Sequence, residues 1–134
     1  MVNWHCKKFD DLSPHELYNI MQLRNEVFVV EQNCVYQDAD NKDPHCYHLI
    51  GWRNEKLVAY TRLLPPGLAY TEPSIGRVVS SPSARGGGIG RELMEKSIEQ
   101  VSQLFGTTSI KIGAQLSPFA YQTIFLPLYS AAHC

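Results

Sequence analysis

The sequence lacks the features of a membrane-spanning or exported chain. Its 134 residues contain no apolar run long enough to cross a bilayer, and the opening segment MVNWHCKKFDD has no apolar core of a signal peptide. The formal net charge is −1 and there is no basic run, so nothing indicates a general attraction for nucleic acid. We therefore expect a cytoplasmic protein that has neither a membrane nor a nucleic-acid partner.

The cysteines of the chain also lack the spacing of a disulfide framework or a metal site. Its four cysteines, Cys6, Cys34, Cys46 and Cys134, show no framework spacing, and the sequence has no C-x-x-C pair. The HCYH segment over residues 45–48 has no second ligand pair at a matching offset, which argues against a zinc site. We expect four free thiols, as in a reducing compartment, and no bound metal.

What remains is the composition of a globular protein, with 44% hydrophobic and 19% charged residues. The length fits a single domain over residues 1–134, since domains span roughly 100–200 residues. Alternating polarity predicts a strand near residues 2–8, and Ser13, Pro14 and Glu16 together form a helix start with a capping box. The later pattern predicts strands over 47–52, 56–64, 74–80 and 108–115, and a helix over 89–105.

Three successive glycines, Gly86, Gly87 and Gly88, stand between a predicted buried strand and a helix. A strand, a glycine-rich turn and a helix N-terminus together make an anion site, because the first helical amides lack partners and the helix dipole is positive there. Arg85 and Arg91 flank the turn and add positive charge and forked donors. The sequence therefore predicts a site for a phosphate ligand.

Two common phosphate motifs do not fit this turn. A Walker loop needs Gly-Lys-Ser/Thr, and the chain has Gly-Arg-Glu at residues 90–92. A dinucleotide fingerprint needs a third glycine at position 93 and an acid at the end of the next strand; these positions hold Leu93 and Gln115.

The turn instead resembles the acyl-CoA pyrophosphate loop of the GNAT N-acetyltransferase superfamily, R/Q-x-x-G-x-G/A, which residues 85–90 match as RGGGIG. The segments LRNEVFVVEQNCVYQDADNKD, HLIGW, LVAYTRLLPPG and SIGRVV narrow the resemblance to the ElaA-like family, over about residues 4–115. It implies an α/β (α+β) fold with a mixed, mostly antiparallel sheet that splays open after its central strand and is flanked by helices.

The resemblance implies acetyl-CoA as the cosubstrate and no metal. Pantetheine would pair with the main chain of Val78, Val79 and Ser80. The pyrophosphate would lie on the loop, whose expected binding residues are Arg85, Gly86, Gly87, Gly88, Ile89, Gly90 and Arg91.

The implied reaction is direct attack of an amine on the acetyl thioester. A main-chain amide near Val79 could stabilise the developing oxyanion, and Tyr121 is the candidate acid for the departing thiolate. For the acceptor side the candidates are Glu26, Glu31, Gln32 and His48, with Glu31 as the possible general base; proton loss through a water chain is equally open. Arg24 and Arg62 either structure the site or bind an acidic acceptor.

The expected acceptor is a small-molecule amine or a peptide. Two other functions remain open: an acyltransferase of the acyl-homoserine-lactone-synthase type, and a CoA-binding protein without turnover. The second arises because the tail after Lys111 has no Asp, Glu, Lys or Arg and departs from the family pattern. Final strands that are atypical or missing would leave a sheet edge open, which predicts a homodimer.

Overall fold

The computed structural model describes residues 1–107 and 109–113, and the account below concerns this part of the chain. Its sheet has five strands in the order β1-β2-β3-β4-β5. They are β1 (Asn3–Lys8), β2 (Tyr47–Arg53), β3 (Lys56–Leu64), β4 (Ser74–Ser80) and β5 (Lys111–Gly113). The first four pair antiparallel and β5 runs parallel to β4, which confirms the predicted mixed, mostly antiparallel sheet.

The first helix, α1 (Pro14–Arg24), begins as the sequence predicts. The Ser13 hydroxyl accepts from the Glu16 amide at 3.0 Å, and the Glu16 carboxylate accepts from the Ser13 amide at 2.8 Å, which completes the capping box. The helix then widens into a π-helix, η2 (Asn25–Glu31), whose C-cap residue is Gln32. Seven residues of π-helix are uncommon, and such segments are frequent at functional sites.

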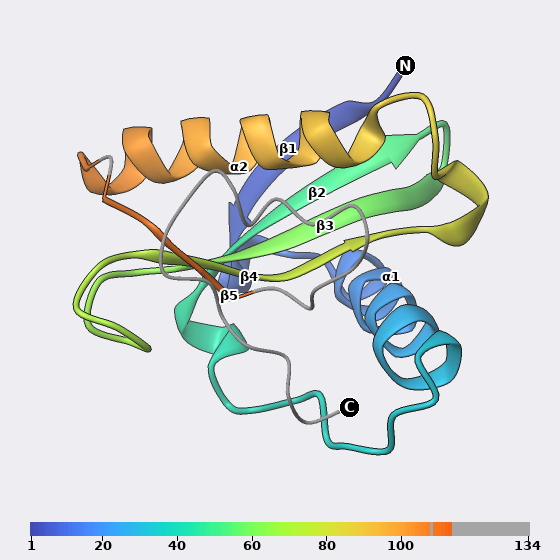
Figure 1. The fold of residues 1–134 in the computed structure, drawn as a ribbon, viewed down its shortest axis with the longest axis horizontal. Coiled ribbons are helices and arrows are strands. Elements are labelled where there is room, and N and C mark those ends of the chain that lie inside the picture. The colour runs from blue at the N-terminus through green and yellow to red at the C-terminus, as the bar shows by residue number, and fades with distance from the viewer. Residues whose placement is uncertain (108, 114–134) are drawn as a thin grey trace.

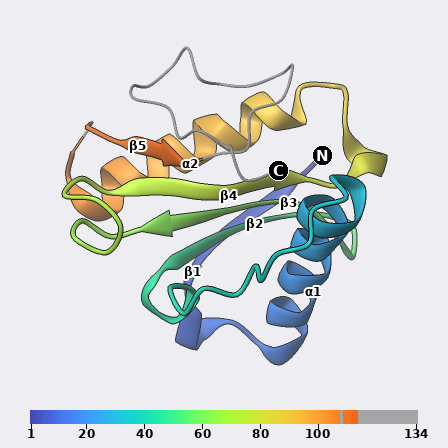
Figure 2. The same cartoon turned by 60° about the horizontal axis from the view of Figure 1, so that its bottom comes forward.

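The two long helices cover opposite faces of the sheet (Figures 1 and 2). On one face, Ile20 of α1 and Phe28 of η2 pack with Ile50 and Tyr60 of the central strands. On the other face lies α2 (Ile89–Phe105), whose apolar side contacts the sheet through two clusters. This arrangement brings the end of η2 close to the segment that joins β4 to α2, as Figure 2 shows.

Strand β4 carries a bulge at its centre. Gly76 lies opposite Arg62 and Val79 opposite Tyr60, so β4 uses three steps where β3 uses two. Arg77, at the bulge, has φ +51°, a left-handed conformation that is rare for a residue with a side chain. Strand β5 pairs only with Ser74, Ile75 and Gly76, so in the described chain β4 is without a neighbour on that side after the bulge.

A network of ion pairs fixes the long connection between η2 and β2. Arg24, fully buried on α1, donates to Asp38 at 2.7 Å and to Asp43 at 2.9 Å. Burial alone would lower the pKa of Arg24, but the surrounding negative charges outweigh it and raise that pKa. The Arg24 guanidinium therefore stays charged and must stay paired.

Two further arginines extend this network from the sheet. Arg62 on β3 donates to Asp40 and Asp43, each at 2.8 Å, and Arg77 donates to Asp38 at 2.8 Å and to Asp40 at 3.4 Å. Three arginines thus meet three aspartates, which leaves the cluster balanced in charge. The alternative that Arg24 and Arg62 bind an acidic acceptor does not fit, since both side chains are buried and already paired with these aspartates.

The cysteines differ in part from expectation. Cys6 and Cys46 are free thiols, and burial raises their pKa to about 11 and about 12. Cys34 is disulfide-bonded, which corrects the prediction that all four are reduced. Cys134 lies outside the described residues. Within residues 1–107 and 109–113, no helix is long and apolar enough to cross a membrane, and no cluster of His, Cys, Asp or Glu is arranged to hold a metal ion.

We predict that Arg24→Met lowers the free energy of unfolding by about 3 kcal/mol, because it leaves two desolvated carboxylates short of their partner. Denaturant unfolding measures the loss. Arg53→Met is the matched control, since Arg53 is exposed and the described chain offers it no ion-pair partner; its effect should stay within about 0.5 kcal/mol. Equal losses in the two variants would contradict the role of the network.

The network also predicts acid sensitivity. Burial would raise the pKa of Asp40, but Arg62 outweighs it and lowers the pKa to about 2, below the unfolded value of about 3.9. The stability that Asp40 contributes is therefore complete above about pH 4 and is lost as pH falls toward 2. Between pH 5 and pH 2, the free energy of unfolding should fall less steeply in Asp40→Asn than in the wild type. Asp11→Asn, which changes an exposed aspartate, should follow the wild type. Parallel curves for all three proteins would exclude this contribution.

Candidate functional site

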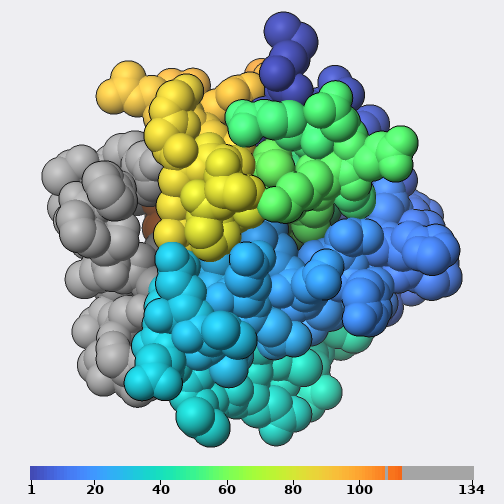
Figure 3. All heavy atoms as spheres, turned by 90° about the vertical axis from the view of Figure 1, so that its right-hand side faces the viewer, coloured from blue at the N-terminus to red at the C-terminus, as the bar shows by residue number. Residues whose placement is uncertain are grey.

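The predicted phosphate loop lies between the end of β4 and the start of α2. A short 3-10 helix, η4 (Pro82–Ala84), precedes it. Ala84 and Ile89 are buried in one apolar cluster and anchor the two ends of the loop, while the four residues between them are exposed. In Figure 3 this segment, in yellow, borders the green β2–β3 turn on one side and the blue segment that contains η2 on another. The loop is thus fixed at its ends and open to solvent at its centre.

The three glycines are needed for their backbone conformation. Gly86, Gly87 and Gly88 have φ values of +90°, +66° and +85°, which side-chain-bearing residues rarely adopt. A Cβ atom on any of them would meet no atom within 4 Å, so protein packing does not demand glycine here. The space above the loop is open, and a ligand could approach the bare backbone.

The amides of this loop form an anion site. The first hydrogen bond of α2 runs from the Glu92 amide to the Gly88 carbonyl at 3.0 Å, and no side chain caps the helix. In the part of the chain that the structure describes, the amides of residues 86–91 donate to no acceptor. Six consecutive free donors at the positive end of a 17-residue helix can hold a pyrophosphate.

The end of β4 supplies an extended backbone beside this loop. Val79 is buried and pairs with Tyr60 of β3, whereas Val78 and Ser80 are half-buried. On the side toward β5, the described chain provides no strand to pair with this half of β4. An extended ligand could therefore pair with its main chain there, as predicted for pantetheine.

Arg85 and Glu31 form a two-pronged ion pair next to the glycines. The two terminal nitrogens of Arg85 donate to the two carboxylate oxygens of Glu31 at 2.7 and 2.8 Å. These hydrogen bonds hold the pKa of Glu31 below its usual range. Glu31, the predicted general base, is therefore a weak base while it stays paired.

His48 lies in the core rather than at the surface. Its side chain is 0% exposed; Nε2 donates to the Asp43 carbonyl at 3.0 Å, so Nδ1 of the neutral ring accepts from the Tyr60 hydroxyl at 2.6 Å. Burial lowers the pKa of His48, which favours that neutral ring. Direct contact between His48 and an acceptor, as the sequence analysis expects, does not fit this placement.

The remaining predicted residues are placed as follows. Glu26 and Gln32 are exposed at the two ends of η2, and Arg91 is exposed in the first turn of α2. The structure thus brings Glu31 to the glycine loop and leaves Glu26 and Gln32 on the same open segment. Tyr121, the predicted acid, lies outside the described residues.

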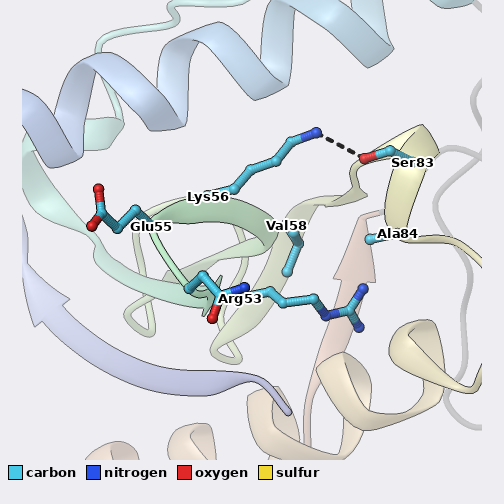
Figure 4. A pocket seen from close by; sticks show the side chains of 7 residues that line it. Arg53, Glu55, Lys56, Val58, Ser83 and Ala84 are labelled. Atoms are coloured by element: carbon cyan, nitrogen blue, oxygen red, sulfur yellow. Dashed lines mark hydrogen bonds between the residues drawn. The ribbon is translucent and has the colours of Figure 1, made fainter.

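A hollow lies beside η4, between it and the β2–β3 turn (Figure 4). Its lining includes Arg53, Lys56 and Val58 from the hairpin and Ser83 from η4. Lys56 Nζ donates to the Ser83 hydroxyl at 2.8 Å across it. This bond ties the hairpin to the short helix from which the glycine loop starts.

Sequence reasoning missed the π-helix and the bulge residue Arg77. Nothing in the composition of residues 25–31 marks a π-helix. The residues that Arg77 binds, Asp38 and Asp40, stand in a segment that reads only as a polar loop. Their D-x-D-x-x-D spacing with Asp43 is a signal only once the three arginines are known to face it.

These features define an acyltransferase fold, and comparison with known proteins specifies it. The model of the acetyltransferase (GNAT) family matches residues 15–118, so the chain belongs to that family. Protein ElaA of Escherichia coli is 39% identical over 132 residues, covering 96% of this chain and 86% of that protein. UPF0039 protein sll0451 of Synechocystis sp. is 42% identical over 115 residues, covering 85% of this chain and 75% of that protein.

Solved structures agree with this assignment. An acyl-CoA N-acyltransferase from Pseudomonas aeruginosa superposes with a TM-score of 0.81 at 45% identity, covering 86% of this chain and 80% of that one. Escherichia coli ElaA superposes with the same TM-score at 40% identity, covering 86% and 79%. The predicted resemblance to the ElaA-like family is confirmed.

Proposed function

We propose that this acyltransferase moves the acetyl group of acetyl-CoA to a primary amine, by direct attack of the amine on the thioester. The observation that carries the proposal is the run of amides over residues 86–91 at the start of α2, which have no acceptor among the described residues. The family membership supports an acyl-CoA donor, because its fold generally uses one. The intact RGGGIG loop favours a CoA donor over an acyl carrier protein.

The loop and β4 fit the donor in two ways. The six amides supply hydrogen bonds to the pyrophosphate without any side chain above the glycines. The half of β4 after its bulge offers an extended main chain at Val78, Val79 and Ser80 for the pantetheine arm. The acetyl group would then lie close to the centre of the sheet, where the strands diverge.

The transfer needs three further contributions from the protein. A main-chain amide near Val79 stabilises the negative charge that develops on the thioester oxygen. A base or a water chain removes the amine proton, since a free amine with a pKa near 10 is protonated at neutral pH. Tyr121 donates a proton to the departing thiolate. The acceptor is a small amine or a peptide, and Glu26, Glu31 and Gln32 on the exposed segment are the candidates to contact it.

The donor site predicts the effect of one substitution. Gly88→Asp places a side chain and a negative charge where the pyrophosphate would lie, so the affinity for CoA should fall at least about 100-fold, as for a like-charge contact with loss of amide donors. Isothermal titration with CoA measures the change.

Gly67→Asp is the matched control, because Gly67 has φ +89° and open space around its Cβ position but lies in the β3–β4 loop. Both variants strain a left-handed residue, so they should lose similar stability, and only Gly88→Asp should lose CoA. Equal CoA affinity in folded Gly88→Asp and Gly67→Asp would refute the proposed donor site.

The proposed role of Tyr121 as the acid predicts that its substitution slows turnover. Tyr121→Phe should lower kcat for acetyl transfer by about 100-fold with little change in CoA affinity, because the thiolate then leaves without a proton. A thiol-release assay over a panel of polyamines, amino-acid derivatives, aminoglycosides and peptide N-termini first finds the acceptor.

Tyr129→Phe, in the same tail, is the control and should keep its kcat. Full activity in Tyr121→Phe would assign the proton to another group. CoA binding without turnover on any amine would indicate a binding protein.

A further inference from the structure

Arg85 donates hydrogen bonds to two groups that the proposed reaction needs, the Glu31 carboxylate and the Ser80 carbonyl. One terminal nitrogen donates to Glu31, and the other donates both to Glu31 and, at 3.2 Å, to the carbonyl of Ser80. Ser80 ends the strand that the pantetheine arm would follow, and Arg85 directly precedes the three glycines. A single guanidinium therefore bridges η2, the end of β4 and the edge of the amide site.

We propose that Glu31 serves Arg85 as a substitute for the pyrophosphate in the free protein, and that acyl-CoA displaces it. Arg85 then turns to the phosphate, and the released Glu31 carboxylate binds the ammonium group of the acceptor. This inference rests on the proposed function, and it makes Glu31 a residue that links donor binding to acceptor binding.

The exchange is energetically easy. The side chains of Arg85 and Glu31 are 40% and 38% exposed, and exposed ion pairs contribute little to stability. A pyrophosphate carries more negative charge than one carboxylate and presents several oxygens to the fork of an arginine. The six free amides bind it at the same time, whereas Glu31 has no such support from the loop.

The same movement frees the main chain of β4. While Arg85 donates to the Ser80 carbonyl, that oxygen is in part occupied. Once the guanidinium has turned to the phosphate, the carbonyl can accept a hydrogen bond from an amide of the pantetheine arm. The movement of Arg85 thus prepares the site for both the pyrophosphate and the pantetheine arm of the donor.

The released carboxylate favours a cation. Glu31 would then lie near the bound phosphate and near Glu26, which already acts on Arg85 through its charge. When Arg85 turns to the phosphate, the Glu31 carboxylate loses its cationic partner, and the amine acceptor arrives as an ammonium at neutral pH. The hydrogen bonds of Arg85 lower the pKa of Glu31, so their loss also makes the carboxylate a better proton acceptor.

The test is a double-mutant cycle of CoA affinity by isothermal titration, with Glu31→Gln, Arg85→Gln and the double variant. Glu31→Gln should bind CoA about two- to five-fold more tightly, the factor that an exposed ion pair supplies. When Arg85 is already replaced by Gln, Glu31→Gln should not change the CoA affinity, because Glu31 and CoA no longer compete for the same guanidinium. Glu99→Gln, an equal charge change at an exposed position of α2, should bind CoA as the wild type does.

Acetylation kinetics supply the second readout. Glu31→Gln should raise the acceptor KM about ten-fold while CoA binds more tightly; a loss of structure would weaken both. The inference is wrong if Glu31→Gln binds CoA no more tightly, if the gain persists without Arg85, or if the acceptor KM does not rise. Failure of the wild type itself to bind CoA would overturn the proposed function, and this inference with it.

Discussion

The balanced cluster of Arg24, Arg62 and Arg77 with three aspartates is the constraint on which the rest of the structure depends. A buried guanidinium does not lose its proton, so each arginine needs its carboxylates in place. The pairs join α1, β3 and β4 to the connection between η2 and β2. Because this connection continues from η2, the cluster also fixes the segment that brings Glu31 to the glycine loop.

Arg77 joins this cluster to the bulge in β4. Its left-handed backbone makes the bulge in β4, and its side chain reaches Asp38 and Asp40. A strained backbone persists only where its surroundings fix it, and here the ion pairs do so. The same residue therefore shifts the register of β4 against β3 and marks the point after which β4 lacks a described neighbour.

The local features of the fold could be predicted from the sequence. The capping box at Ser13, the β2–β3 hairpin and the glycine loop before α2 each depend on neighbouring residues. The ionic cluster could not, because its arginines stand 14 to 39 positions from the aspartates they bind. Likewise, His48 reads as a polar residue on a strand, and only the packed structure shows that Asp43 and Tyr60 satisfy both of its nitrogens in the core.

The amides of residues 86–91 also make the stability of the fold depend on the concentration of the ligand that they bind. The three glycines before α2 have more freedom to lose on folding than other residues, and within residues 1–107 and 109–113 no acceptor compensates their amides. A ligand held by these amides binds only the folded chain, and at 100 times its dissociation constant it would stabilise that state by about 2.7 kcal/mol. The fraction of chains that survive proteolysis in a cell would then rise and fall with the supply of that ligand.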